Sequence, residues 1–153
     1  MGNSIQISSF NFLGSRITHL DFDSSIFRFE DRVFTKKIGY KIEIKEVGND
    51  GDHHHYGEVV LTIEVDLEGK DNAQGNNATI HLAIEGGFHA PDEMDIEEFK
   101  KMLQINGAAA LYSIARSYLI SVTSQSFVYG DIVLPLVNFF PNSASEEETK
   151  EKS

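Results

Sequence analysis

The residues best suited to chemistry lie in one short segment, DGDHHHYG, residues 50–57. Imidazole and carboxylate groups are good ligands for zinc, nickel or copper. Three consecutive histidines do not close easily on one ion, because neighbouring side chains of an extended chain point to opposite sides. We therefore expect a polar hairpin loop with no metal and no cofactor. A small α+β metal-dependent enzyme that uses His53–His55 remains an alternative.

Other catalytic patterns are weak. Carboxylates recur at Asp21 and Asp23, and again along residues 64–68, but acid–base chemistry needs such a pair in a cleft. Alternation places these carboxylates on an open sheet face. No serine stands in a G-x-S-x-G setting. The glycines of EGGF, residues 85–88, have no phosphate-loop lysine, and we expect a turn or bulge at the end of a strand there. The sequence predicts no enzyme.

The composition indicates one domain in a reducing compartment. The 153 residues include 41% hydrophobic residues, eleven Phe and five Tyr, which is enough for a core. No apolar run approaches the ~18–20 residues that a membrane span requires, so no membrane insertion is expected. The absence of cysteine and of a signal-peptide pattern at the first residues fits the cytoplasm. A net charge of −11 repels nucleic-acid phosphates and favours basic partners.

The first two-thirds of the chain alternate with the period of a β-strand. Each strand has one polar face and one apolar face, which predicts an antiparallel sheet that is covered on one side only. Turn residues at 48–52 and 68–77 join the last three strands as two successive hairpins. The predicted strands cover residues 15–23, 40–47, 59–69 and 79–86.

A long helix follows the strands. Residues 95–104 carry acids first and lysines later, which suits the helix dipole, and residues 106–125 continue the pattern. Asn106-Gly107 is able to end one helix and cap the next. The second segment has two apolar stripes, one of Gly107, Leu111, Ile114, Tyr118 and Val122, and one of Ala108, Tyr112, Ala115 and Leu119. A helix that is apolar on two faces needs cover on both, which we assign to a partner subunit. The alternative is that residues 127–140 fold back over the helix.

Apolar residues outside the regular pattern favour a binding surface. Residues 24–40 mix phenylalanines with basic residues, and residues 132–140 are mostly apolar. Such clusters are typical of a patch that binds an extended apolar peptide. Nucleic acid is disfavoured by the surrounding negative charge. We predict a single domain over residues 1–141 and a disordered acidic tail over residues 142–153.

These residues resemble the SecB family of protein-export chaperones. Ala115-Arg116 matches the core of the long helix of that family, and Pro135 with Val137-Asn138-Phe139 matches the signature after it. EGGF at residues 85–88 matches the turn that leaves the fourth strand. The resemblance implies an α+β fold, in which a four-stranded antiparallel sheet precedes a long α-helix packed on one face. It also implies a homotetramer, built as a dimer of dimers.

The resemblance further implies a holdase that hydrolyses nothing, binds unfolded polypeptides or preproteins, and delivers them to the translocation ATPase SecA. The SecA-docking residues would be Asp21, Asp23 and Glu85, and the oligomer interface Ala108, Tyr112, Ala115 and Leu119. Residues implied in client binding are Phe27, Phe29, Phe34, Tyr40, Phe88, Met94, Met102, Phe127, Tyr129, Ile132 and Leu134.

The chain departs from the family pattern in three respects. The acidic positions of the first and fourth strands match only loosely, with His19 and Leu82 near places where the family has acids, and the histidine loop has no counterpart in the family. The second helix of the family is absent after Phe139, where Phe140-Pro141 and an acidic tail follow. Two other functions remain open for the same fold. One is a chaperone dedicated to a single partner such as an antitoxin, and the other is a structural oligomer without a client groove.

Overall fold

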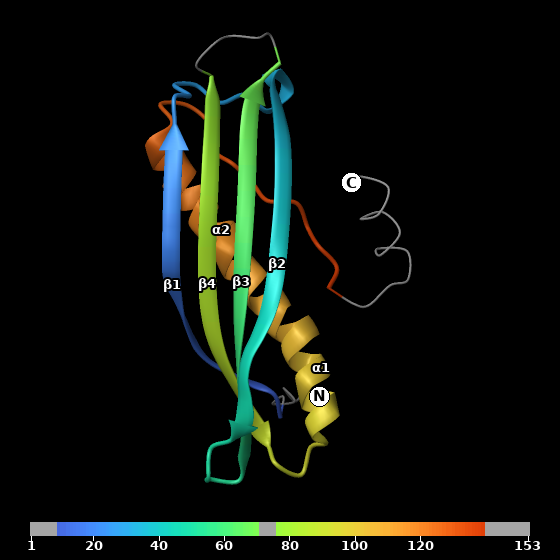
Figure 1. The fold of residues 1–153 in the computed structure, drawn as a ribbon. Coiled ribbons are helices and arrows are strands. Elements are labelled where there is room, and N and C mark those ends of the chain that lie inside the picture. Colours follow the sequence, from blue (N-terminus) through green and yellow to red (C-terminus); the bar gives the residue numbers. More distant parts are fainter. Residues whose placement is uncertain (1–8, 71–75, 140–153) are drawn as a thin grey trace, which may run out of the picture.

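The computed structural model describes residues 9–70 and 76–139, which form one sheet and one helical layer (Figure 1). The predicted tail at residues 142–153 lies outside the described residues. The helical layer contains α1 (Ile96–Met102), the π-helical stretch η2 (Leu103–Gly107) and α2 (Ala108–Ser126). A short 3-10 helix, η1 (Asp31–Val33), precedes the second strand. The strands are β1 (Asn11–Ser24), β2 (Phe34–Asn49), β3 (His54–Gly69) and β4 (Asn77–Pro91).

The four strands pair in the order β1-β4-β3-β2, and every pairing is antiparallel. The two predicted hairpins, β2–β3 and β3–β4, are confirmed. β1 lies at the far edge beside β4, so residues 25–33 carry the chain across one end of the sheet to β2 (Figure 1). β2 begins at Phe34, whereas the sequence predicted an irregular segment up to residue 40. Lys36, Lys37 and Gly39 weaken the apolar alternation there, although the residues pair with β3.

The sequence predicted a turn or bulge at a strand end for EGGF, but residues 85–88 lie inside β4. Gly86 and Gly87 pair with β1 on one side and β3 on the other, inside β4. The irregularity lies in β1 instead, where the register shifts between Phe12 and Gly14. A Cβ at Gly86 would lie 2.7 Å from Cδ2 of Leu111. The glycine therefore permits α2 to approach the sheet closely.

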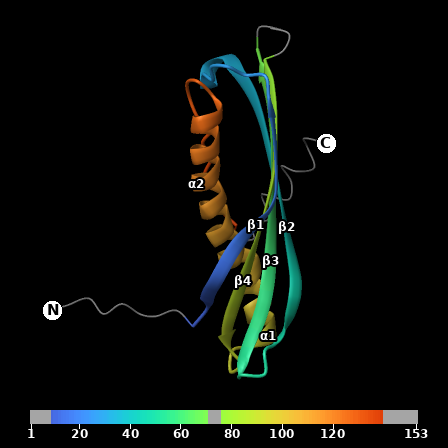
Figure 2. The ribbon, with the colours of Figure 1, turned by 90° about the vertical axis from the view of Figure 1, so that its left-hand side faces the viewer.

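Apolar and polar side chains alternate along β3 and β4, which gives the sheet one buried face and one solvent-exposed face. Val59, Leu61 and Ile63 of β3, with Ile80 and Leu82 of β4, are at most 1% exposed. Figure 2 shows the helical layer on this side of the sheet, and the described residues leave the opposite side, called here the outer face, open. The fold class predicted from the sequence, a four-stranded antiparallel sheet with a long helix on one face, is confirmed.

The helix begins at a capping residue and runs on without the predicted break. The side chain of Asp95 accepts a hydrogen bond from the N–H of Glu98, and acids fill the first turn. At 103–107 the chain widens into a π-helical turn, and Gly107 keeps right-handed helical geometry there. A Cβ at Gly107 would lie 3.2 Å from Val59 and 3.3 Å from Phe88, so this glycine fits close packing and does not cap a helix. Among the described residues, none of the helices has both the length and the hydropathy that a membrane span requires.

Residues 127–139 run back along α2 (Figure 1). In the described part of the chain, the second face of the helix is therefore covered by this segment, which was the alternative to a partner subunit. The hydroxyl of Tyr112 donates to the carbonyl of Pro135, and Nε of Arg116 donates to that of Leu134 at 2.8 Å. Ile132 and Leu134 are buried as a result. The predicted interface is wrong for this conformation, because its four residues are at most 5% exposed inside the single chain: Ala108, Tyr112, Ala115 and Leu119.

Candidate functional site

The first apolar surface lies where residues 25–33 cross the end of the sheet and meet the chain that leaves α2. Phe27, Val128 and Tyr129 are each at least 65% exposed, and they are called here the crossover surface. The N–H of Val128 donates to the carbonyl of Phe27, and the N–H of Phe29 to that of Tyr129, both at 2.9 Å. These two bonds fix the backbone beneath the exposed rings. The guanidinium of Arg28 lies 5.7 Å from the Tyr129 ring centre.

An aromatic cluster supports the crossover surface from below. Phe29 stacks on Phe127 at 5.6 Å between ring centres, and it also packs on Phe34 at 5.2 Å. All three rings are at most 6% exposed, and Phe22 of β1 closes the cluster at 6.0 Å from Phe127. The exposed rings of the crossover surface therefore stand on a rigid apolar base.

A second apolar surface lies between α2 and β2. The rings of Tyr40, Tyr112 and Phe139 meet edge to face, with centres 5.4 to 6.4 Å apart. Tyr40 is 46% exposed, so this cluster reaches the solvent. A hollow beside it is lined by Ala109, Tyr112, Ser113, Arg116, Ser117, Ile120, Leu136, Val137 and Phe139. Leu136 is 83% exposed at its rim.

The predicted client-binding residues divide by burial. Phe27, Tyr40 and Tyr129 are exposed, and Met94 and Met102 are half-buried. The other six belong to the core in this conformation and do not offer a surface to a guest: Phe29, Phe34, Phe88, Phe127, Ile132 and Leu134. Sequence reasoning did not separate rings that support the surface from rings that form it, because both kinds alternate within one irregular segment.

A third apolar surface was missed by the sequence analysis. Phe12, Ile17 and Leu20 of β1 stand opposite Phe88, Ile84 and Leu82 of β4, on the face that α2 covers elsewhere. They remain 37–46% exposed. We call these three residues the β1 strip. β1 is an edge strand, and the alternation of Leu20 with Phe22 in SRITHLDFD was the available signal.

The residues predicted to dock SecA lie on the outer face. Asp21 and Asp23 are exposed on β1, opposite His81 and Thr79 of β4. Glu85 is less accessible, with a side chain 16% exposed and 3.5 Å from Arg16. The outer face therefore presents carboxylates from β1, and Glu64 and Asp66 of β3 are exposed nearby.

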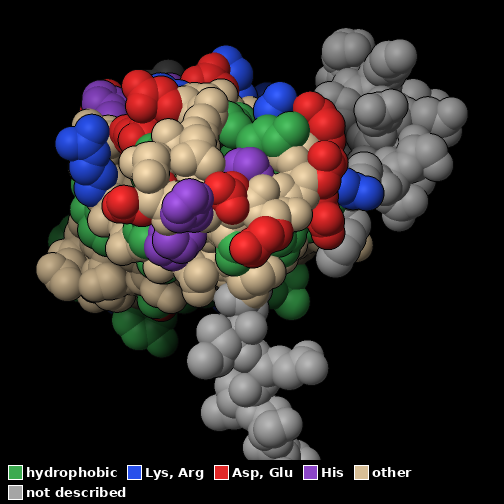
Figure 3. Space-filling view, turned by 90° about the horizontal axis from the view of Figure 1, so that it is seen from below, with side chains coloured by type: hydrophobic (Ala, Val, Ile, Leu, Met, Phe, Trp, Pro, Cys, Tyr) green, Lys and Arg blue, Asp and Glu red, His purple; other side chains and the backbone are tan. Residues whose placement is uncertain are grey.

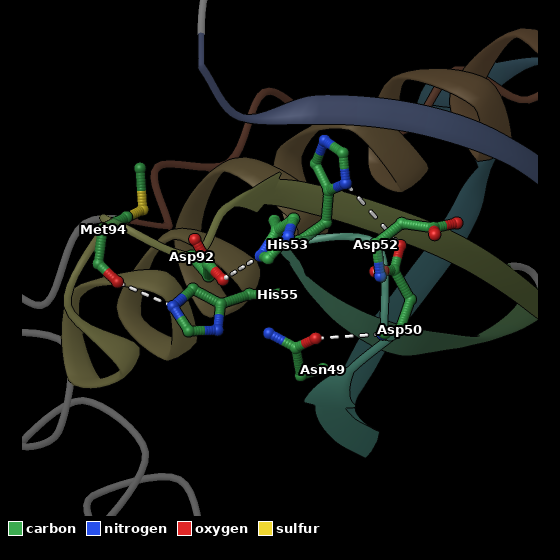
Figure 4. Close-up of polar contacts among 9 residues, drawn as sticks. Asn49, Asp50, Asp52, His53, His55, Asp92 and Met94 are labelled. Atoms are coloured by element: carbon green, nitrogen blue, oxygen red, sulfur yellow. Dashed lines mark hydrogen bonds and ion pairs between the residues drawn. The ribbon is translucent and has the colours of Figure 1, made fainter.

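The three consecutive histidines point to three different partners. Nδ1 of His53 lies 3.5 Å from Asp92, and a ring nitrogen of His55 lies 2.6 Å from the carbonyl of Met94, both drawn in Figure 4. Nδ1 of His54 lies 3.9 Å from Asp50. His53 adopts φ 63°, a left-handed conformation that closes the hairpin. The run His53–His55 therefore does not converge on one ion, and the enzyme alternative loses its proposed ligand set.

Comparison with solved structures identifies the fold. A SecB-like chaperone of Mycobacterium tuberculosis, Rv1957, in complex with a ChAD peptide from the HigA1 antitoxin Rv1956, superposes with a TM-score of 0.65. The match covers 84% of this chain and 91% of that chain at 15% identity. The fold is SecB-like.

Three further findings accompany this result. A protein of unknown function from Streptococcus agalactiae matches with a TM-score of 0.51 at 13% identity, over 83% of this chain and 97% of that chain. No family model matches the chain, and no curated protein matches it. The SecB-like fold therefore rests on three-dimensional similarity.

Proposed function

We propose that this protein is a SecB-like chaperone that binds extended apolar segments of unfolded polypeptides and has no catalytic activity. The observation that carries the proposal is the crossover surface, where Phe27, Val128 and Tyr129 remain in water on a hydrogen-bonded backbone. Large aromatic side chains are seldom left exposed together unless a partner covers them. The SecB-like fold supports the same conclusion.

The physical basis of binding is burial of apolar area. Each square ångström of apolar surface removed from water contributes about 25 cal/mol, independently of the sequence of the guest. An unfolded chain offers such area along its whole length, and a native protein does not. A fixed aromatic surface therefore selects unfolded guests without reading one sequence. The arrangement works in the cytoplasm, where newly made chains are unfolded.

A dedicated client is favoured over a broad range of preproteins. The similar chaperone Rv1957 was solved with a peptide from one antitoxin. In this chain the crossover surface is small, and the groove beside α2 already holds the chain's own residues 132–139. One short apolar segment fits this area better than a long preprotein does. Crosslinking in cells distinguishes the two cases, since one dominant partner is expected for a dedicated chaperone.

Docking to SecA is a separate proposal that rests on the outer face. Asp21 and Asp23, with Glu85 beside them, would attract a basic segment of SecA by long-range electrostatics. Asp21→Asn with Asp23→Asn should weaken any SecA binding while client binding is unchanged. The combination of lost client binding and intact SecA binding would contradict this assignment.

We propose that copies of the chain assemble through β1 into a homotetramer, a dimer of dimers. β1 is an edge strand of 14 residues, and an uncovered edge of this length is a template for pairing with another strand. The β1 strip belongs to the same strand, and its three side chains are still partly exposed. A second copy would continue the sheet and cover Phe12, Ile17 and Leu20, which replaces the interface predicted from the sequence.

The test measures whether the protein delays folding of a slowly folding preprotein at a stoichiometric ratio. We expect a delay, and we expect Phe27→Ala with Tyr129→Ala to reduce it severalfold because each ring removes apolar area. Phe127 is unsuitable for this test, since its ring is 3% exposed and truncation would cost about 3–5 kcal/mol of stability. Leu13→Ala, an exposed apolar residue of β1, is the matched control. No delay at any ratio would exclude a broad range of preproteins, and no delay together with no dominant crosslinked partner in cells would overturn the proposed function.

A further inference from the structure

Two side chains of the β2–β3 hairpin and one of β4 meet at the end of the sheet where this hairpin lies. Figure 3 views this end and shows histidine and acidic side chains gathered on it. Asp50, His54 and His89 each offer one ligand atom, and these atoms all lie within 4.8 Å of one another. The cluster takes one histidine from the run of three and adds His89 from β4, which is 35 residues further along the chain.

The sheet register builds the cluster. His54 is opposite Pro91, and His89 is opposite Tyr56, so the two histidines are diagonal neighbours across β3 and β4. Their rings lie 4.8 Å apart between centres and are nearly parallel, at 12°. The cluster stands at the edge of the folded region, accessible from solution, with the His54 side chain 39% exposed and that of Asp50 33% exposed.

The carboxylate of Asp50 is oriented by the hairpin. Its Oδ1 accepts a hydrogen bond of 2.8 Å from the N–H of Asp52, which leaves Oδ2 to face His54 at 3.9 Å. The backbone N–H of Asp50 donates to the carbonyl of His54 and closes the loop. The Asp52 N–H holds the pKa of Asp50 below its usual range, and contacts with His54 and His89 act in the same direction. The hairpin therefore directs the Asp50 carboxylate toward the two imidazoles.

We propose that Asp50, His54 and His89 bind one divalent transition-metal ion, with zinc as the best match. Two imidazoles and one carboxylate form a common zinc donor set, and water would complete a tetrahedron. Bonds of about 2.1 Å need ligand atoms roughly 3.4 Å apart in that geometry, so the side chains would close inward from their present spacing. The half-exposed positions of His54 and Asp50 leave room for this rotation.

Binding at this site would join the β2–β3 hairpin to β4. His53 and His55 stay outside the ligand set, because they are engaged by Asp92 and by the carbonyl of Met94. The site lies at the opposite end of the sheet from the crossover surface (Figure 1), and it does not depend on the proposed chaperone function. Its role would be to stabilise the folded chain through an ion that binds the folded state only.

The test titrates zinc into the full chain without a histidine tag, by calorimetry and by thermal unfolding. We expect one ion for each chain, a rise in Tm, and weaker binding at acid pH because imidazole ligands must be deprotonated. His89→Ala and Asp50→Asn should each weaken zinc binding by at least about tenfold. Asn keeps the oxygen that accepts from the Asp52 N–H, so Asp50→Asn leaves the loop intact.

His53→Ala is the matched control, since His53 belongs to the same run but lies outside the cluster. We expect its zinc affinity to equal that of the unaltered chain. Co²⁺ should give the visible absorption of a tetrahedral site, and His89→Ala should abolish it. Equal loss with His53→Ala and His89→Ala would mean adventitious binding by the histidine run and would overturn the proposal. Unchanged affinity in folded Asp50→Asn, or no saturable binding, would overturn it as well.

Discussion

The Oγ1 atom of Thr123 joins the long helix to the chain that returns over it. It accepts a hydrogen bond of 2.8 Å from the N–H of Ile132 and donates one of 2.6 Å to the carbonyl of Leu119. Thr123 is a buried polar residue of the core, at 0% exposed. Its hydroxyl therefore holds residues 127–139 at the start of their path along α2.

Replacement of Thr123 by Val should release this segment. The side chain keeps its shape, but the buried N–H of Ile132 loses its acceptor, which costs about 1–3 kcal/mol. Urea unfolding measures the loss, and hydrogen exchange should show that the Ile132 amide loses protection. Thr123→Ser keeps the hydroxyl and is the control, with the Ile132 amide still protected. Equal protection in the Val and Ser variants would show that Thr123 does not anchor the segment.

Replacement of Gly86 by Ala should destabilise the packing of the helix on the sheet. The added Cβ would lie 2.7 Å from Leu111, whose side chain is fully buried and has little room to move. Overpacking of this kind costs about 1–3 kcal/mol in unfolding free energy. Gly39→Ala in β2 is the control, because its added Cβ meets nothing within 4 Å. We expect that control to be neutral or slightly stabilising, and a similar loss in both variants would refute the packing argument.

The phenol of Tyr56 should titrate late. Its hydroxyl donates to Glu58 at 2.7 Å, and this bond, burial and nearby carboxylates raise the pKa of Tyr56 to about 12. The unfolded value is about 10, so the neutral phenol stabilises the fold fully below about pH 10. This contribution is lost as the pH rises from about 10 to 12. The difference between the ultraviolet titrations of the unaltered chain and of Tyr56→Phe measures the midpoint of Tyr56 ionisation.

Glu58→Gln tests the cause of that shift. The substitution replaces the charged acceptor of the Tyr56 hydrogen bond, the largest cause of the raised pKa, by a neutral one and removes the negative charge of Glu58, so the midpoint should move back toward 10. A midpoint near 10 in the unaltered chain would mean that the hydrogen bond between Tyr56 and Glu58 does not persist in solution.

Charges on the β1 strip should reduce the size of the assembly. Ile17→Lys with Leu20→Lys would place two cations where we propose that a second copy packs. Light scattering should then give a lower mass than for the unaltered chain. His19→Lys lies on the outer face of the same strand and should leave the mass unchanged. A monomer for the unaltered chain would contradict the proposed assembly.

Local patterns predicted the strands and the helix because each depends on a short period of apolar residues. Val59 to Leu67 alternate without interruption, and the structure confirms that strand. Asn106-Gly107 was predicted as a helix end, but a glycine in a sequence indicates either a helix end or close packing. At Gly107 the glycine serves close packing, because Val59 and Phe88, which lie far from it along the chain, pack directly against it.

The surfaces were harder to predict than the elements. Phe27 and Phe29 have the same residue type two positions apart, yet Phe27 is 69% exposed and Phe29 5%. The hydrogen bonds of residues 27–29 with 128 and 129 determine this difference, and no local pattern encodes them. His89 likewise joins His54 only through the register of β3 and β4. Contacts between distant parts of the chain therefore set both candidate sites.

The central claim is that the crossover surface receives unfolded guests. A photo-crosslinking phenylalanine analogue at position 27 measures this directly, with an unfolded polypeptide as the guest and the same analogue at Thr62 on the outer face as the reference position. We predict strong crosslinking from position 27, competed by unlabelled guest, and little from position 62. Equal crosslinking from the two positions, or none from position 27, would contradict the account.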